Sequence, residues 1–131
     1  MPRYALLGFL GAIFVSACVS QPTSSSDIFC TLSVDPALVV YITDSATARP
    51  LAGAALGVVR DGTFLDSLRP RLFAESGVML ARAGANERPG TYRVSLTLPG
   101  YRAWTSASVM VTRGVCHVNT QTLQARLQPV P

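Results

Sequence analysis

Apolar and polar residues alternate in short runs along the chain downstream of Cys30, and glycine, proline, aspartate and asparagine separate these runs. The clearest run is 91–98 (TYRVSLTL), in which every second residue is apolar. Such a period of two gives a strand one apolar and one polar face, whereas an amphipathic helix repeats every 3.6 residues. No stretch of a dozen residues keeps the helical period. The pattern therefore predicts an all-β domain.

Six further segments have strand character and are bounded by turn residues. They are 37–43, 54–60, 63–68, 77–81, a run containing Val109 and Val111, and 115–127 with a bulge near Gln121. Asp61-Gly62 is expected to join two of these strands in a hairpin. The segment 69–88 fits either a short strand or a helical turn, and we expect the strand. Seven short strands predict one antiparallel β-sandwich of two sheets.

The first seventeen residues have a different pattern, in which one charge, Arg3, precedes an uncharged apolar run over 4–15. As a helix this run would measure roughly 18 Å, which is shorter than the ~30 Å hydrocarbon core of a bilayer. A short apolar run after a basic residue is typical of a signal peptide. We therefore expect residues 1–17 to be removed on export.

The end of this run, Val15-Ser16-Ala17-Cys18, resembles a bacterial lipobox. The resemblance implies cleavage before Cys18 by signal peptidase II and attachment of acyl chains such as palmitate, which anchor a protein to a membrane without spanning it. Val19, in place of aspartate, resembles the sorting signal of lipoproteins retained in the outer membrane. An ordinary secretory signal with a chance cysteine is the alternative.

The serine- and threonine-rich segment 18–29 is expected to be a flexible lipidated tether, and 30–131 the folded domain. Several short motifs of that domain resemble the carboxypeptidase regulatory-like, transthyretin-like family. They are PLAGA (50–54), DG (61–62), GTYRV (90–94) and PGYRAW (99–104). The resemblance covers 37–127 except for 69–88, and it implies a transthyretin-like sandwich without naming a ligand.

Composition adds limits on the partners of the chain. Hydrophobic residues make up 49 % and charged residues 14 %, which is too apolar for a disordered chain. The eleven basic residues are all arginine, the net charge is +4, and no basic run is long enough to predict nucleic-acid binding. Four arginines fall within 69–88, where they form either a patch for an acidic partner or a merely solvated loop.

The cysteines indicate a disulfide. Export leads to an oxidising compartment, so Cys30 and Cys116, which remain once Cys18 is lipidated, are expected to pair and to join the first strand to the last. The chain-entropy model gives such a bond about 4.6 kcal/mol. Two unpaired thiols are the alternative.

No catalytic, metal or cofactor site is predicted. The chain contains one histidine and no Gly-x-Ser-x-Gly motif. On a strand Cys116 and His117 would point to opposite faces, so they would not share a metal ion, and His117 is expected to be a solvent-facing or hydrogen-bonded strand residue. Asp61 and Asp66 could flank a sugar as paired carboxylates, but we expect Asp61 to belong to a hairpin turn and Asp66 to be a solvated strand residue.

The candidate binding residues are Tyr101, Arg102 and Trp104, because exposed aromatic side chains stack on sugars or anchor protein partners. A core position for Trp104 is the competing interpretation. The sequence thus predicts a non-catalytic outer-membrane lipoprotein that faces the periplasm and acts as a structural or protein-interaction module. The alternative is a carbohydrate-binding module. The expected partners are the membrane, through Cys18, and an envelope protein or polysaccharide.

Overall fold

The computed structural model describes residues 28–131, which contain nine β-strands and no helix. The expected signal peptide and Cys18 lie outside the described residues. The strands are β1 (Pro36–Asp44), β2 (Leu56–Asp61), β3 (Phe64–Ser67), β4 (Arg69–Phe73), β5 (Met79–Asn86), β6 (Gly90–Thr97), β7 (Trp104–Thr105), β8 (Val109–Val111) and β9 (Gln121–Leu127). The all-β prediction is confirmed.

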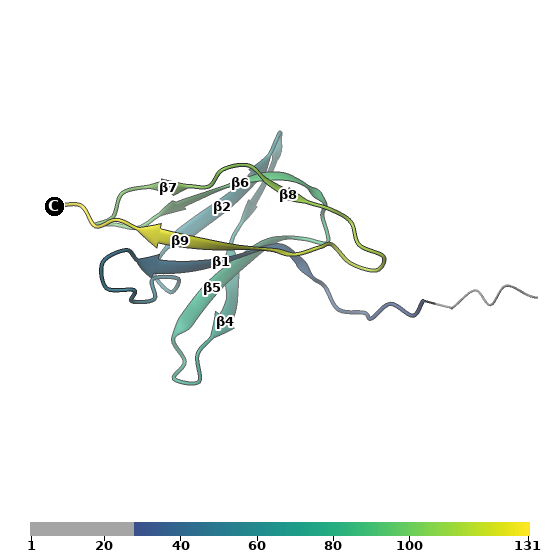
Figure 1. The fold of residues 1–131 in the computed structure, drawn as a ribbon, viewed down its shortest axis with the longest axis horizontal. Coiled ribbons are helices and arrows are strands. Elements are labelled where there is room, and N and C mark those ends of the chain that lie inside the picture. The colour runs from purple at the N-terminus through teal and green to yellow at the C-terminus, as the bar shows by residue number, and fades with distance from the viewer. Residues whose placement is uncertain (1–27) are drawn as a thin grey trace, which may run out of the picture.

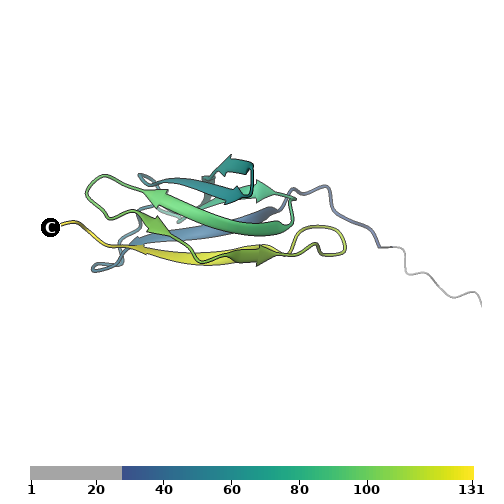
Figure 2. The ribbon, with the colours of Figure 1, turned by 90° about the horizontal axis from the view of Figure 1, so that it is seen from above.

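The strands form two sheets that pack as the two layers of a sandwich (Figure 1, Figure 2). One sheet has the order β4-β5-β1-β9, and the other has the order β3-β2-β6-β7, with β8 also paired to β6. Every strand pair is antiparallel except β1 and β9, which run parallel from Leu38 beside Gln121 to Asp44 beside Leu127. The predicted antiparallel sandwich is therefore correct apart from this one pair.

The predicted number of seven strands was wrong. The ambiguous segment contains two strands, β4 and β5, and β5 begins at Met79 and continues to Asn86. The short strand β7 was also missed, because it pairs with β6 through only two residues, Trp104 and Thr105. Strands that depend on a neighbour for their hydrogen bonds leave a weak periodic signal in their own residues.

The alternation that predicted strand β6 also describes the core. Tyr92, Val94 and Leu96 are fully buried and face the interior, where they belong to the same cluster as Leu38 and Ile42 of β1. The outer face of β1 is covered too, because its Val39 packs with Ala81 and Ala83 of β5. A strand buried on both faces explains why β1 reads as a continuous apolar run.

The predicted strand over 115–127 begins only at Gln121. Residues 112–120 form a loop, closed by a bridge between Arg113 and Val118 and by a 2.7 Å hydrogen bond from Gly114 N to His117 O. A Cβ on Gly114 would lie 2.7 Å from that same oxygen, so the loop requires glycine there. The chain enters β9 from the end at which β1 also begins, and this makes the two strands parallel.

The sandwich has two ends with different contents (Figure 1, Figure 2). We call the end formed by 28–35, Glu87 and 112–120 the stapled end, and the end formed by 44–50, 99–104 and 128–131 the distal end. The nine-residue strand β1 runs from one end to the other, a length of about 30 Å. Within residues 28–131 no helix is long and apolar enough to cross a membrane.

Candidate functional site

The distal end holds the predicted binding residues, and the turn after β6 positions the first of them. Gly100 takes a φ of 83°, and Tyr101 N donates to Leu98 O at 3.0 Å. This turn directs the Tyr101 hydroxyl to Asp44, where it donates to Oδ2 at 2.7 Å. Tyr101 is half-buried against the core. Its polar group is therefore committed to an internal contact.

The carboxylate of Asp44 organises the turn after β1. Its Oδ1 accepts hydrogen bonds from Ala46 N at 2.8 Å and from Thr47 N at 2.9 Å, while Oδ2 accepts the Tyr101 hydroxyl. The hydrogen bond from Tyr101 and those from the two amides lower the pKa of Asp44 to about 2, against the opposing effect of burial. A buried, ionised and fully hydrogen-bonded carboxylate is typical of a structural role.

Trp104 and Arg102 lie beside a shallow polar groove. Trp104 pairs with Leu96 and is half-buried against the core, whereas Arg102 is exposed and its amide donates to Gln128 O at 2.8 Å. The groove has a volume of about 410 Å³, and its lining residues are Arg102, Ala103, Trp104, Thr105, Arg126 and Gln128. The structure thus brings Arg102 and Trp104 to one groove, whereas the hydroxyl of Tyr101 is hydrogen-bonded to Asp44.

Sequence reasoning missed Arg126 and Gln128, which complete this groove. They lie at the end of β9 and just after it, and the terminal segment reaches the groove by pairing Pro129 with Tyr101. The Arg126 guanidinium donates to Ser45 O at 2.9 Å, which holds it near the groove. No local pattern marks either residue, because only the pairing of the two segments brings them to Trp104.

The chemistry of the groove suits an anionic group. Its lining includes two guanidinium groups and one amide side chain, and it includes no carboxylate. Arginine binds carboxylate and phosphate groups through paired N–H donors, and the exposed part of an indole ring offers a flat apolar surface. This arrangement can bind an acidic, flat ligand.

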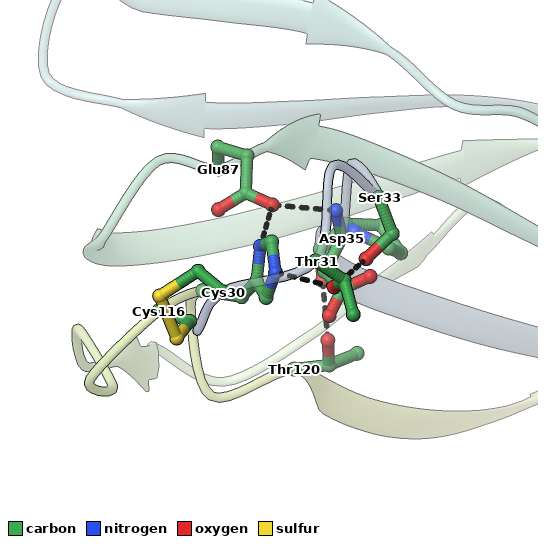
Figure 3. Close-up of polar contacts among 9 residues, drawn as sticks. Cys30, Thr31, Ser33, Asp35, Glu87, Cys116 and Thr120 are labelled. Carbon is green, nitrogen blue, oxygen red and sulfur yellow. Dashed lines mark hydrogen bonds and ion pairs between the residues drawn. A yellow bond between two sulfur atoms is a disulfide. The ribbon is translucent and has the colours of Figure 1, made fainter. Parts of the chain in front are cut away.

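The stapled end contains the predicted disulfide (Figure 3). Cys30 and Cys116 are bonded with their Cα atoms 5.3 Å apart, so the predicted pairing is confirmed. The elements that it joins were predicted wrongly, because Cys30 lies in the segment before β1 and Cys116 in the loop before β9. The bond therefore fixes the incoming chain to the sandwich instead of tying two strands together.

A short hydrogen-bonded network lies beside this disulfide (Figure 3). The Nδ1–H of His117 donates to Glu87 Oε1 at 2.7 Å, and the same oxygen accepts from Asp35 N at 2.7 Å. His117 Nε2 lies 3.0 Å from Thr31 Oγ1. The hydrogen bond to Glu87 raises the pKa of His117, and the pKa of Glu87 is lowered, mainly by the Asp35 amide.

His117 is accordingly a hydrogen-bonded residue, as predicted, but it lies in a loop and not on a strand. Its partners hold the segment 28–35 against the domain. In the part of the chain that the structure describes, no three histidine, cysteine or acidic residues are grouped closely enough to bind a metal ion.

The four arginines of 69–88 do not form one patch. Arg82 donates to the carbonyl oxygens of Ala52 at 2.6 Å and Leu68 at 3.2 Å, and Arg88 pairs with Asp61 at 3.5 Å. The other two, Arg69 and Arg71, lie on the exposed edge strand β4 together with Pro70. Charge and proline on an edge strand hinder pairing with another sheet.

Asp61 lies at the predicted hairpin turn, whereas Asp66, expected to be a solvated strand residue, makes a partly buried hydrogen bond within the domain. Asp61 lies at the end of β2 beside Phe64, across the two-residue turn that contains Gly62 with a φ of 56°. Asp66 accepts a hydrogen bond from Ala85 N at 2.9 Å and thereby connects the two sheets. Both carboxylates thus have partners within the domain.

Comparison of the sequence with known proteins does not assign a family. No protein-family model matches the chain, and no curated protein is similar to it at a significant level. The resemblance to the carboxypeptidase regulatory-like family thus stays a prediction from short motifs.

Proposed function

We propose that this chain is a non-catalytic lipoprotein, anchored through Cys18 to the outer membrane and facing the periplasm, whose β-sandwich acts as a structural or protein-interaction module of the carboxypeptidase regulatory-like type. The observation that carries the proposal is the disulfide between Cys30 and Cys116. Disulfides persist in exported proteins and are rare in the bacterial cytoplasm. The bond therefore supports the export that the lipobox-like sequence predicts.

The position of the disulfide suits a tethered domain. Cys30 lies twelve residues after Cys18 in the sequence, at the point where the chain joins the sandwich. A covalent bond at this position keeps the N-terminal segment attached to the domain when the tether is pulled. The groove lined by Arg102 and Arg126, beside the distal end, is then free to bind an anionic group on a partner protein.

Lipid attachment is tested by following the processing of the full chain in a Gram-negative host. Globomycin, which inhibits signal peptidase II, should leave the unprocessed form, and mass spectrometry of the untreated protein should show acyl chains on Cys18. The Cys18→Ser variant is the control and should accumulate unprocessed without the drug. Unchanged processing in the presence of globomycin would refute the anchor.

A carbohydrate-binding module remains the second candidate, and the half-exposed Trp104 in the polar groove favours it. Acidic polysaccharides of the envelope should then change the fluorescence of this single tryptophan, and the Arg102→Ala variant should weaken the response. Arg93→Ala, on β6 outside the groove, is the matched control. A flat titration across a panel of glycans would remove this candidate and leave the protein-interaction module.

A further inference from the structure

We infer that the stapled end is a membrane-contact surface, whose exposed apolar side chains lie in the interfacial layer of the bilayer. The inference rests on the proposed lipid anchor and adds to it an orientation of the domain. It assigns the partner of this surface as phospholipid, with the distal end pointing away from the membrane.

Five large apolar side chains are exposed at this end. In the segment before β1 the exposed fraction is 65 % for Ile28, 90 % for Phe29, 102 % for Leu32 and 58 % for Val34, and in the loop before β9 it is 79 % for Val115. Two of them directly flank the disulfide in sequence, because Phe29 precedes Cys30 and Val115 precedes Cys116. Two distant parts of the chain therefore present apolar tips at one place.

The structure gives these residues a fixed position. The disulfide and the Thr31–His117 contact hold the N-terminal segment against the loop, and the hydrogen bond from Asp35 N to Glu87 holds it against the turn between β5 and β6. In a free tail, exposed apolar residues would have no common orientation. Here the cross-link keeps them together at the end of the sandwich.

The length of the tether indicates which surface meets the bilayer. Ile28 lies ten positions after Cys18 in the sequence, and a linker of that length with random-coil statistics has an average span of about 16–19 Å. Acyl chains in the membrane would therefore hold the stapled end at about that average distance from the headgroups. The distal end lies about 30 Å further along β1. Such proximity gives the apolar tips a high effective concentration at the bilayer.

The charges at this end favour apolar insertion over attraction to anionic lipid. Arg113 is an exposed cation of the loop, while Asp35 contributes one negative charge and the carboxylate of Glu87 is paired with His117. No excess of basic residues is present to bind acidic headgroups. We therefore expect contact with zwitterionic phospholipid as well as with anionic phospholipid.

The test uses the mature lipidated protein in phosphatidylcholine vesicles whose acyl chains carry bromine, which quenches nearby tryptophan. The wild type contains only Trp104, at the distal end, and its emission should be unchanged by bromine. The Phe29→Trp and Val115→Trp variants add a probe at the stapled end. Each added probe should lose roughly half of its emission, because interfacial side chains lie about 5–10 Å into the headgroup boundary.

Two matched variants control the measurement. Val130→Trp adds an exposed probe at the distal end, where 48 % of the valine is exposed, and it should stay unquenched. Leu32→Glu, placed in the Val115→Trp protein, should reduce the quenching at position 115. Leu65→Glu makes the same substitution at a leucine of β3 that is 54 % exposed and lies outside the stapled end, and it should not reduce the quenching.

The outcomes separate this inference from the proposed anchor. If Cys18 carries acyl chains but neither added probe is quenched, the membrane-contact surface is refuted and the anchor stands. If the probes change their emission with protein concentration but not with bromine, a second copy covers this end and the inference is equally refuted. If Cys18 proves unmodified the anchor fails, and quenching of the same probes by added vesicles still decides the surface.

Discussion

Removal of the disulfide is the most informative perturbation, since it tests how strongly the N-terminal segment contributes to the stability of the domain. Cys30 and Cys116 are separated by 86 positions in the sequence, so the bond closes a loop that includes most of the sandwich. For a loop of that length, the loss of entropy in the unfolded chain corresponds to about 4.6 kcal/mol at 25 °C. Neither cysteine belongs to the buried core cluster, so the fold itself should survive.

The assay is urea unfolding of the Cys30→Ala/Cys116→Ala double variant against the oxidised wild type, followed by circular dichroism. With a slope of about 2 kcal/mol per molar urea, the midpoint should fall by roughly 2 M while the native spectrum stays that of a β-protein. Reduced wild type should behave like the double variant. Thr31→Ala is the matched control, because it removes only two exposed hydrogen bonds, to His117 and to Ser33, and should cost about 1 kcal/mol.

A midpoint within a few tenths of a molar of the wild type would refute this reasoning. It would mean that the unfolded chain is already restricted, or that the segment before β1 adds nothing to the stability of the sandwich. A helical or unfolded spectrum of the double variant would refute the assignment of the core to residues away from the cysteines.

Three further predictions concern polar groups with defined partners. Arg82→Met should lower the free energy of unfolding by about 1–3 kcal/mol, because the Ala52 and Leu68 carbonyl oxygens lose a charged donor, and chemical denaturation measures this loss. Tyr101→Phe should raise the pKa of Asp44 from about 2 toward its ordinary value, which an NMR titration of the carboxyl carbon would detect, and an unchanged pKa would contradict the geometry. Because that pKa is depressed in the folded state, the stabilising effect of Asp44 should be present above about pH 4 and lost as the pH falls through about 2. The hydrogen bond to Glu87 raises the pKa of His117, so the contribution of His117 to the free energy of unfolding should be full below about pH 6.5 and lost as the pH rises through its folded-state pKa. The urea midpoint of the wild type should fall over that pH range. A His117→Gln variant should not show this fall.

Local patterns in the sequence were sufficient for much of the fold. The alternation in 91–98 identified β6 and its buried face, and the apolar run at 37–43 identified the central strand β1, because side-chain periodicity follows from strand geometry alone. The Asp61-Gly62 turn was also predictable, since glycine readily adopts the positive φ that this hairpin requires. The disulfide followed from the number of cysteines and the expected compartment.

The composition of the distal groove depended on the tertiary structure. Arg102 and Trp104 were visible as a cluster in the sequence, but Arg126 and Gln128 joined them only through the pairing of the terminal segment. The hydrogen bond from Tyr101 to Asp44 could not be predicted from the sequence either, because 57 positions separate the two residues. Contacts between distant segments depend on how the whole chain packs, which no short window of residues contains.

The sequence by itself determined that the domain is a β-sandwich, where its main strands and turns lie, and which two cysteines were available to pair. Only the tertiary structure decided that β9 runs parallel to β1 and that β4 and β7 form edges of the two sheets. It also decided that the disulfide joins the segment before β1 to the loop before β9. The physical reason is the range of the interactions. Strand periodicity and turn conformation arise between near neighbours, whereas sheet order and the two ends of the sandwich arise from backbone hydrogen bonds and packing between segments far apart in the chain.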